Sequence, residues 1–299
     1  MATEVNASPG LAGRSRRWWA VAATLAACAG AVAVFAPVLY YMVLHWQGSQ
    51  DYSHGFLIVP LAAYFAWERR RKLTRAPIDG SWWGLAPLLL GVLALSIGRL
   101  GVELMSMRTG FVLTLNGMVL LLLGLPVYRI LAFPLLFLFL MVPLPQSLVN
   151  VIAFPLQLVA ADLAVSTVQS FGLPVLREGN IIHLPNDFRL FVAEACSGLR
   201  SLMALGTLGV VFAYFFRKSW WERLVLVAST IPIAVLVNAL RVGITVVLSW
   251  HWGPQAAEGA IHQTEGFFTF GLAFCLLMVE AWLLSLVRPD RAAAQRRVA

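Results

Sequence analysis

Long apolar runs separated by short polar stretches make up most of the chain. A helix needs about 20 apolar residues to cross the hydrocarbon core of a bilayer, and most of the runs approach or exceed that length. The pattern therefore predicts an all-α polytopic membrane protein with about eight transmembrane helices. The eight runs lie approximately at residues 19–44, 55–67, 82–100, 109–125, 128–143, 195–216, 222–248 and 264–287. The second run is short, so it either extends backward through the preceding polar stretch or thins the bilayer locally.

A further apolar stretch, residues 145–171, does not fit this series. Polar residues recur along it, and Pro143, Pro145 and Pro155 would break or kink a simple span. If it crossed the membrane, the basic clusters that follow it would change sides. We therefore expect an amphipathic or re-entrant helix on the outer side of the membrane.

A small β element is expected between this helix and the sixth run. Two short extended stretches flank the Glu178–Asn180 segment, where Gly179 suits a tight turn. The stretch Asp187–Val192 continues in extended form. The predicted β element thus leads directly to Cys196.

Basic residues set the predicted orientation. With eight spans, five basic clusters fall on one side, which the positive-inside rule makes cytoplasmic. The clusters lie at residues 14–17, 69–75, 129, 217–223 and 288–297, and the exceptions are Arg99 and Arg108. We expect a multi-pass membrane protein with both termini in the cytoplasm.

This orientation also divides the chain. We expect a cytoplasmic N-terminal tail at 1–18, a single transmembrane domain at 19–287 and a cytoplasmic C-terminal tail at 288–299. The first run continues unbroken past Cys28, which favours an uncleaved signal-anchor helix over a processed lipoprotein.

Composition excludes several classes of protein. Hydrophobic residues make up 60% of the 299 residues and charged residues only 12%, about half of what a soluble domain carries. The net charge of +8 sits in short clusters between apolar runs, so it does not form the contiguous basic surface that binds nucleic acid. Three cysteines without paired spacing predict neither a disulfide framework nor a zinc site, and no metal or cofactor is expected.

Cys196 differs from the other two cysteines in its surroundings. Cys28 and Cys275 lie inside apolar runs and are expected to pack as small apolar side chains. Cys196 lies at the start of a predicted helix, whose positive dipole end stabilises a thiolate. Its polar neighbours Glu194, Ser197 and Arg200 leave it accessible, and Arg200 lies one turn further on the same face. The pattern favours a nucleophilic cysteine.

An arginine within the seventh run is the second candidate. Placing Arg241 in a membrane helix costs about 2.5–3.5 kcal/mol on insertion scales, so it is a functional candidate by default. Two structural alternatives stay open: Arg241 could snorkel to the outer headgroups, or it could pair with Glu194 or Glu265. Asn238, one turn earlier, could orient the guanidinium.

His262 is the third candidate, at the outer mouth of the eighth run. A histidine in a loop is usually a surface residue, but this one shares the predicted outer side with Cys196 and Arg241. The three types suffice for acyl transfer: a thiolate attacks a carbonyl, a cation stabilises the oxyanion, and an imidazole moves the proton.

These residues, in this order, resemble the exosortase family. The resemblance rests on Glu194-Ala-Cys196-Ser-Gly-Leu-Arg200, on Asn238-x-x-Arg241 and on His262-x-x-x-Gly266. Ser53-His54-Gly55 and Pro155-Leu-Gln157 are similar to further motifs of that family. The resemblance covers about residues 20–287.

The resemblance implies a membrane-embedded cysteine transpeptidase with Cys196 as nucleophile, Arg241 as stabiliser of the oxyanion or thiolate, and His262 as general acid/base. Its substrates would be exported proteins with a C-terminal sorting signal of the PEP-CTERM kind: a short motif, a transmembrane helix and a basic tail. Sorting would be linked to exopolysaccharide machinery. His54 could join the site by orienting His262 or by contacting the sorting motif.

Two alternatives remain at this stage. The first is a transport or assembly component for surface polysaccharide without peptidase chemistry, although the chain lacks a Lys/Asp series through its apolar runs that would favour a proton-coupled transporter. The second is a protease that releases its products by hydrolysis, which shares the same thioester.

Overall fold

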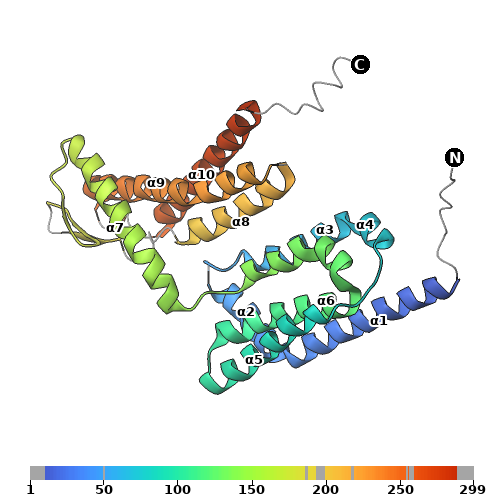
Figure 1. The fold of residues 1–299 in the computed structure, drawn as a ribbon. Helices are drawn as coiled ribbons and strands as arrows, with labels where there is room; N and C mark the ends of the chain where they lie inside the picture. Colours follow the sequence, from blue (N-terminus) through green and yellow to red (C-terminus); the bar gives the residue numbers. More distant parts are fainter. Residues whose placement is uncertain are drawn as a thin grey trace, which may run out of the picture. The chain divides into compact units, whose positions relative to one another are not determined.

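The structure is a computed structural model that describes residues 11–287 except 50, 186–187, 193–198, 217–218, 254 and 256–258. It is predominantly helical, with one small sheet (Figure 1). The chain divides into two compact units at Pro145–Gln146, and each is described by itself.

The elements of the N-terminal unit, as far as the structure describes it, are helices, with one isolated β-bridge between Asp79 and Gly124. Their bounds are α1 (Leu11–Val34), α2 (Ala36–Gly48), α3 (Gly55–Glu68), α4 (Arg70–Arg75), η1 (Trp82–Gly84), α5 (Leu85–Gly101), α6 (Leu104–Phe137) and η2 (Leu138–Met141). Helix α1 begins well before residue 19, where the predicted first span starts, so the helix includes the basic residues Arg14–Arg17.

The predicted all-α polytopic architecture is confirmed. Within the described residues, six helices are long and apolar enough to cross a membrane, and α3 and part of α8 are shorter apolar helices. The fourth and fifth predicted segments lie within α6, whose two helical parts meet at a kink at the non-helical Gly124. Gly124 has a φ of 83°, and a Cβ there would lie 1.6 Å from the carbonyl oxygen of Asp79, so only glycine fits this bend.

Glycines bring α5 and α6 close together. A Cβ on Gly91 would lie 2.6 Å from the carbonyl oxygen of Gly110, and a Cβ on Gly117 would lie 2.5 Å from the backbone nitrogen of Leu88. Close backbone approach through small residues is a usual means of helix association in membranes, where lipid offers no hydrophobic driving force. The α5–α6 hairpin is therefore the most tightly packed part of this unit.

Arginines fasten the predicted cytoplasmic end of this unit. The Arg17 guanidinium donates to the carbonyl oxygens of Leu73 and of Ala76, the latter at 2.9 Å. Arg69 donates to the carbonyl oxygen of Ile130 at 2.5 Å. These bonds join α1, α4 and the second part of α6. The carbonyls of Leu73 and Ala76 lie near a helix end, and that of Ile130 lacks its helical partner because Pro134 has no N–H.

The C-terminal unit combines four long helices with the sheet. Its elements are α7 (Gln146–Ser170), β1 (Leu176–Glu178), β2 (Ile181–His183), β3 (Arg189–Phe191), α8 (Leu199–Phe216), α9 (Trp220–Trp252) and α10 (Gly259–Val287).

The predicted β element is confirmed. The strands form an antiparallel sheet in the order β1-β2-β3, with Glu178 opposite Ile181 across the turn and Ile182 opposite Leu190. Gly179 has the expected positive φ, 62°. The sheet ends on β3, a few residues before Cys196.

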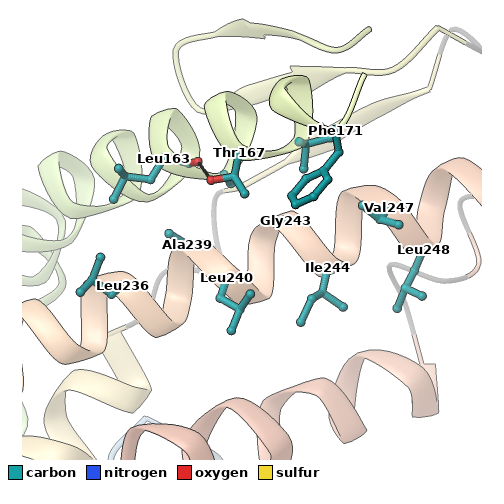
Figure 2. A pocket seen from close by; sticks show the side chains of 12 residues that line it. Leu163, Thr167, Phe171, Leu236, Ala239, Leu240, Gly243, Ile244, Val247 and Leu248 are labelled. Carbon is teal, nitrogen blue, oxygen red and sulfur yellow. Dashed lines mark hydrogen bonds between the residues drawn. The ribbon is translucent and has the colours of Figure 1, made fainter. Parts of the chain in front are cut away.

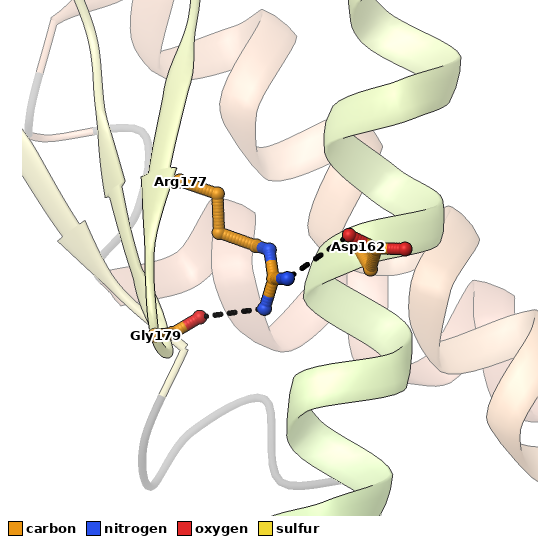
Figure 3. A network of polar contacts seen from close by, with 3 residues as sticks. All are labelled: Asp162, Arg177 and Gly179. Atoms are coloured by element: carbon orange, nitrogen blue, oxygen red, sulfur yellow. Dashed lines mark hydrogen bonds and ion pairs between the residues drawn. The ribbon is translucent and has the colours of Figure 1, made fainter.

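An ion pair ties the sheet to α7. Arg177 on β1 lies 3.0 Å from a carboxylate oxygen of Asp162 and donates to the carbonyl oxygen of Gly179 (Figure 3). Ile182, which is opposite Arg177 in the strand register, and Leu190 pack with Val242 and Val246 of α9 in one buried cluster. The sheet therefore lies against the C-terminal half of α9.

Helix α7 is the further apolar stretch at residues 145–171. It is one helix of 25 residues that runs through Pro155. It is also long and apolar enough to cross a membrane. The proline is accommodated because its missing N–H and its ring cost a helix a local distortion rather than its continuity. Whether α7 lies on the membrane, as the charge pattern predicts, stays a prediction.

Candidate functional site

Arg241 belongs to α9 in the C-terminal unit, and its side chain reaches α10. A Cβ on Gly266 would lie 3.6 Å from a terminal nitrogen of the guanidinium, an ordinary contact distance, so Arg241 lies beside Gly266 of α10. Arg241 also interacts electrostatically with Glu265, which is 8% exposed. Two residues of α10 therefore surround the arginine.

Thr245 completes this polar contact. Its hydroxyl donates to a carboxylate oxygen of Glu265 at 2.8 Å and lies 3.0 Å from the carbonyl oxygen of Arg241. Glu265 is thus held by α9 on one side and faces the arginine on the other. Of the two partners that the sequence left open for Arg241, Glu265 interacts with it electrostatically, while Glu194 lies outside the described residues.

Asn238 lies one turn before Arg241 on α9 and is 7% exposed. The buried polar residues Asn238, Thr245 and Ser249 recur at helical spacing with Arg241, so they mark one side of α9. That Asn238 orients the Arg241 guanidinium stays a prediction.

The remaining candidate residues of this unit are placed only in part. His262 lies in the first turn of α10, one turn before Gly266, and Arg200 lies in the first turn of α8. Only the backbone of these two is described. Glu194, Cys196 and Ser197 lie outside the described residues, so their meeting with Arg241 stays a prediction.

The opposite side of α9 is apolar. It borders a cavity of about 410 Å³ against α7, where Leu163 to Phe171 lie along Leu236 to Leu248 in the same direction (Figure 2). Thr167 is the one hydroxyl in this lining, and it donates to the carbonyl oxygen of Leu163. The cavity offers surface for an apolar chain and no chemistry, so the polar side of α9 is the candidate active site.

His54 belongs to a polar cluster at one end of the N-terminal unit. Its Nδ1 lies 3.0 Å from the carbonyl oxygen of Asp51, and its ring lies 6.2 Å from that of Tyr52. The Tyr52 hydroxyl donates to the carbonyl oxygen of Leu144 at 3.4 Å. Predicted outer segments of the chain therefore meet at this end of the unit, and His54 is held there by its own unit.

Burial changes the acidity of this cluster. Desolvation lowers the pKa of His54, and desolvation together with the nearby Arg108 charge lowers the pKa of His45. Desolvation raises the pKa of Tyr52. Burial alone would raise the pKa of Glu103, but hydrogen bonds from Ser106 and Met105 outweigh it and lower that pKa. At neutral pH both histidines are therefore uncharged.

Sequence reasoning missed several of these groups. Thr245 gave no signal because a threonine in an apolar run is ordinary, and Glu265 entered only as one of two partners for Arg241. Arg108 was treated as an exception to the charge rule, and His45 and Glu103 were not singled out. An arginine in or next to a membrane span is a functional candidate. Arg108 directly precedes the predicted span at 109–125, so the same reasoning would have identified it and its neighbours.

Comparison with known proteins agrees with the sequence motifs. The model of the transmembrane exosortase family (Exosortase_EpsH) matches residues 46–279, from the end of α2 to near the end of α10. No curated protein and no solved structure matches the chain. The match covers more than three quarters of the chain and includes every candidate residue named above. The protein belongs to the exosortase family, a family of membrane transpeptidases that act in protein sorting.

Proposed function

We propose that this exosortase cleaves C-terminal sorting signals of the PEP-CTERM kind at the outer face of the bacterial inner membrane through a Cys196 thioester. The observation that supports this most is the contact of α9 with α10 at Arg241. The guanidinium lies against Gly266, one turn after His262, and faces the Glu265 carboxylate. The backbone of His262 is therefore about one helical turn along α10 from the residue that Arg241 contacts.

The proposed reaction begins with attack of the Cys196 thiolate on the carbonyl carbon of the scissile peptide bond. A C–S bond forms, and the carbonyl oxygen takes up the negative charge next to Arg241. The C–N bond then breaks as His262 gives a proton to the leaving amine. The thioester is resolved by water or by another nucleophile, whose proton His262 accepts.

The test is processing of an exported reporter that ends in a short motif, a transmembrane helix and a basic tail. Cys196→Ala, Arg241→Ala and His262→Ala are expected to leave a normally inserted protein while full-length reporter accumulates. Normal processing by Cys196→Ala would eliminate the proposal. If sorting is intact and polysaccharide export fails only in a deletion strain, the chain is instead a transport or assembly component.

Mass spectrometry of the processed reporter distinguishes the two fates of the thioester. A free carboxylate at the new C-terminus supports hydrolysis. An added group supports transfer and identifies the accepting nucleophile, which links sorting to a surface glycan or lipid if that is its chemistry.

A further inference from the structure

Arg108 is the most buried charged residue for which the described part of the chain offers no ion pair. Its side chain is 4% exposed, and its Nε has no hydrogen-bond partner. The ion pairs Arg177–Asp162 and His183–Glu178 do not involve it. Burying a cation without an anion is costly, so an unbalanced arginine at a helix end points to a ligand.

The nearest carboxylate does not neutralise Arg108 by direct contact. Glu103 interacts with it electrostatically, but its two oxygens accept from the backbone N–H groups of Met105 and Ser106, at 2.8 and 2.6 Å. Glu103 is therefore the N-terminal cap of α6, and it occupies the orphan donors of that helix. The guanidinium is left with the capacity to bind a further anion.

His45 and Tyr52 border the arginine. Both interact electrostatically with Arg108, and their rings lie 5.2 Å apart. Tyr52 is buried, while His45 is exposed at the rim of the cluster. A ligand that reaches Arg108 past His45 would meet an imidazole N–H beside the guanidinium.

The position of this cluster relates it to the substrate. It is formed by the end of α2, the loop before α3 and the first turn of α6, all of which the basic clusters place at the outer face. The sorting signal enters the membrane at that face, where its short motif meets its transmembrane helix.

We propose that Arg108, with His45, binds the carboxylate of an acidic side chain in the substrate segment just outside its transmembrane helix. The proposal rests on the proposed function. The guanidinium N–H groups and an imidazole N–H beside them suit a carboxylate, which accepts charge-assisted hydrogen bonds. The cluster is thus a specificity site, in the N-terminal unit, for one acidic residue.

The experiment pairs enzyme variants with reporter variants in membranes that contain the full-length protein. Each acidic residue of the reporter motif is replaced by its amide, one at a time. Wild-type protein is expected to process one amide reporter about tenfold more slowly than the parent reporter. Arg108→Gln is expected to process both reporters at the same reduced rate, because the interaction is lost from either side.

Arg99→Gln is the matched control. Arg99 is an exposed arginine near the end of α5, which directly precedes the start of α6 where Arg108 lies. It should retain the full difference between the two reporters. Arg108→Lys keeps the charge and should retain part of that difference, which serves if Arg108→Gln does not fold.

Discrimination between the reporters that is unchanged in Arg108→Gln and in Arg108→Lys would overturn the proposal. So would native mass spectra in which Arg108→Gln loses a bound phospholipid while it still discriminates, since the ligand would then be a lipid phosphate. Failure of the proposed function looks different: Cys196→Ala would then process the parent reporter normally.

Discussion

The carboxylate of Glu265 is positioned by α9 and in turn positions the arginine. It accepts from Thr245 and faces Arg241, so its charge and geometry fix where the guanidinium can lie. An arginine that stabilises a transition-state charge must be held in place before the reaction, because reorganisation during the reaction costs catalytic power. Glu265 is therefore a positioning residue in the proposed mechanism.

We predict that Glu265→Gln lowers kcat for reporter processing about tenfold with little change in KM, because the arginine loses its orienting charge. Glu280→Gln is the matched control. Glu280 accepts from Ser229 at 2.5 Å, which is the same kind of carboxylate–hydroxyl contact between α10 and α9. The two variants should lose similar stability, and only Glu265→Gln should lose turnover; equal losses of turnover would remove the special role of Glu265.

The two histidines of the N-terminal cluster predict a pH dependence of stability. Their pKa values are lowered in the folded protein, so the unfolded chain takes up these protons first as pH falls. The contribution to stability is present above the unfolded value of about 6.5 and is lost as pH falls toward the lowered values.

We therefore expect the melting temperature in detergent to decrease between pH 7.5 and 5.5. His54→Gln and His45→Gln should each reduce this decrease, because they remove a group that binds protons only when unfolded. A decrease of equal size in the double variant would assign the effect to other groups.

At the scale of the elements, the α5–α6 hairpin depends on glycines at a spacing of seven residues. Gly84 at the end of η1 and Gly91 and Gly98 on α5 meet α6, which contributes Gly110 and Gly117. A seven-residue spacing keeps these positions on one side of each helix. The neighbouring atoms are mostly backbone, which cannot move aside as a flexible side chain can.

We predict that Gly117→Ala and Gly91→Ala each destabilise the protein by about 1–3 kcal/mol, the usual cost of forcing extra volume into a packed contact. The measurement is the yield of monodisperse protein and its thermal unfolding in detergent. Gly30→Ala and Gly271→Ala have open space at the new Cβ and should be neutral or slightly stabilising. If all four variants unfold at the same temperature as the parent protein, α5 and α6 can move apart without loss of stability.

The sequence was informative about elements because hydrophobic periodicity and turn residues are local. The turn at Gly179 and the positions of most apolar helices follow from short-range preferences of the chain. The continuity of α7 through Pro155 was not foreseen, since a packed partner such as α9 can hold a helix that proline alone would interrupt. The contact of Thr245 with Glu265 depends on how two helices pack, and no local pattern contains it.

At the scale of the whole molecule, orientation and the path of α7 are open to direct measurement. In a background without native cysteines, Ser53→Cys and Val102→Cys should react with a membrane-impermeant maleimide from the outer side. Thr74→Cys should react only after permeabilisation. All three side chains are exposed in the structure.

The same labelling decides the path of α7. We predict that Gln146→Cys and Ser170→Cys, at the two ends of the helix, both react from outside, as the basic clusters require. Reaction of the two ends from opposite sides would make α7 a membrane span and would reverse the predicted side of one of the flanking parts of the chain.

The arginines at the helix ends of the N-terminal unit limit how its topology can be studied. Arg17 and Arg69 belong to the clusters that predict orientation, and they also bond to carbonyls of other helices. A common experiment moves such charges in order to invert the protein. Here it would also remove the hydrogen bonds that hold α1 and α6 to their neighbours, in addition to altering the insertion signal. A misassembled product could then pass for an inverted one. Arg71, which is exposed, is the safer position from which to remove charge.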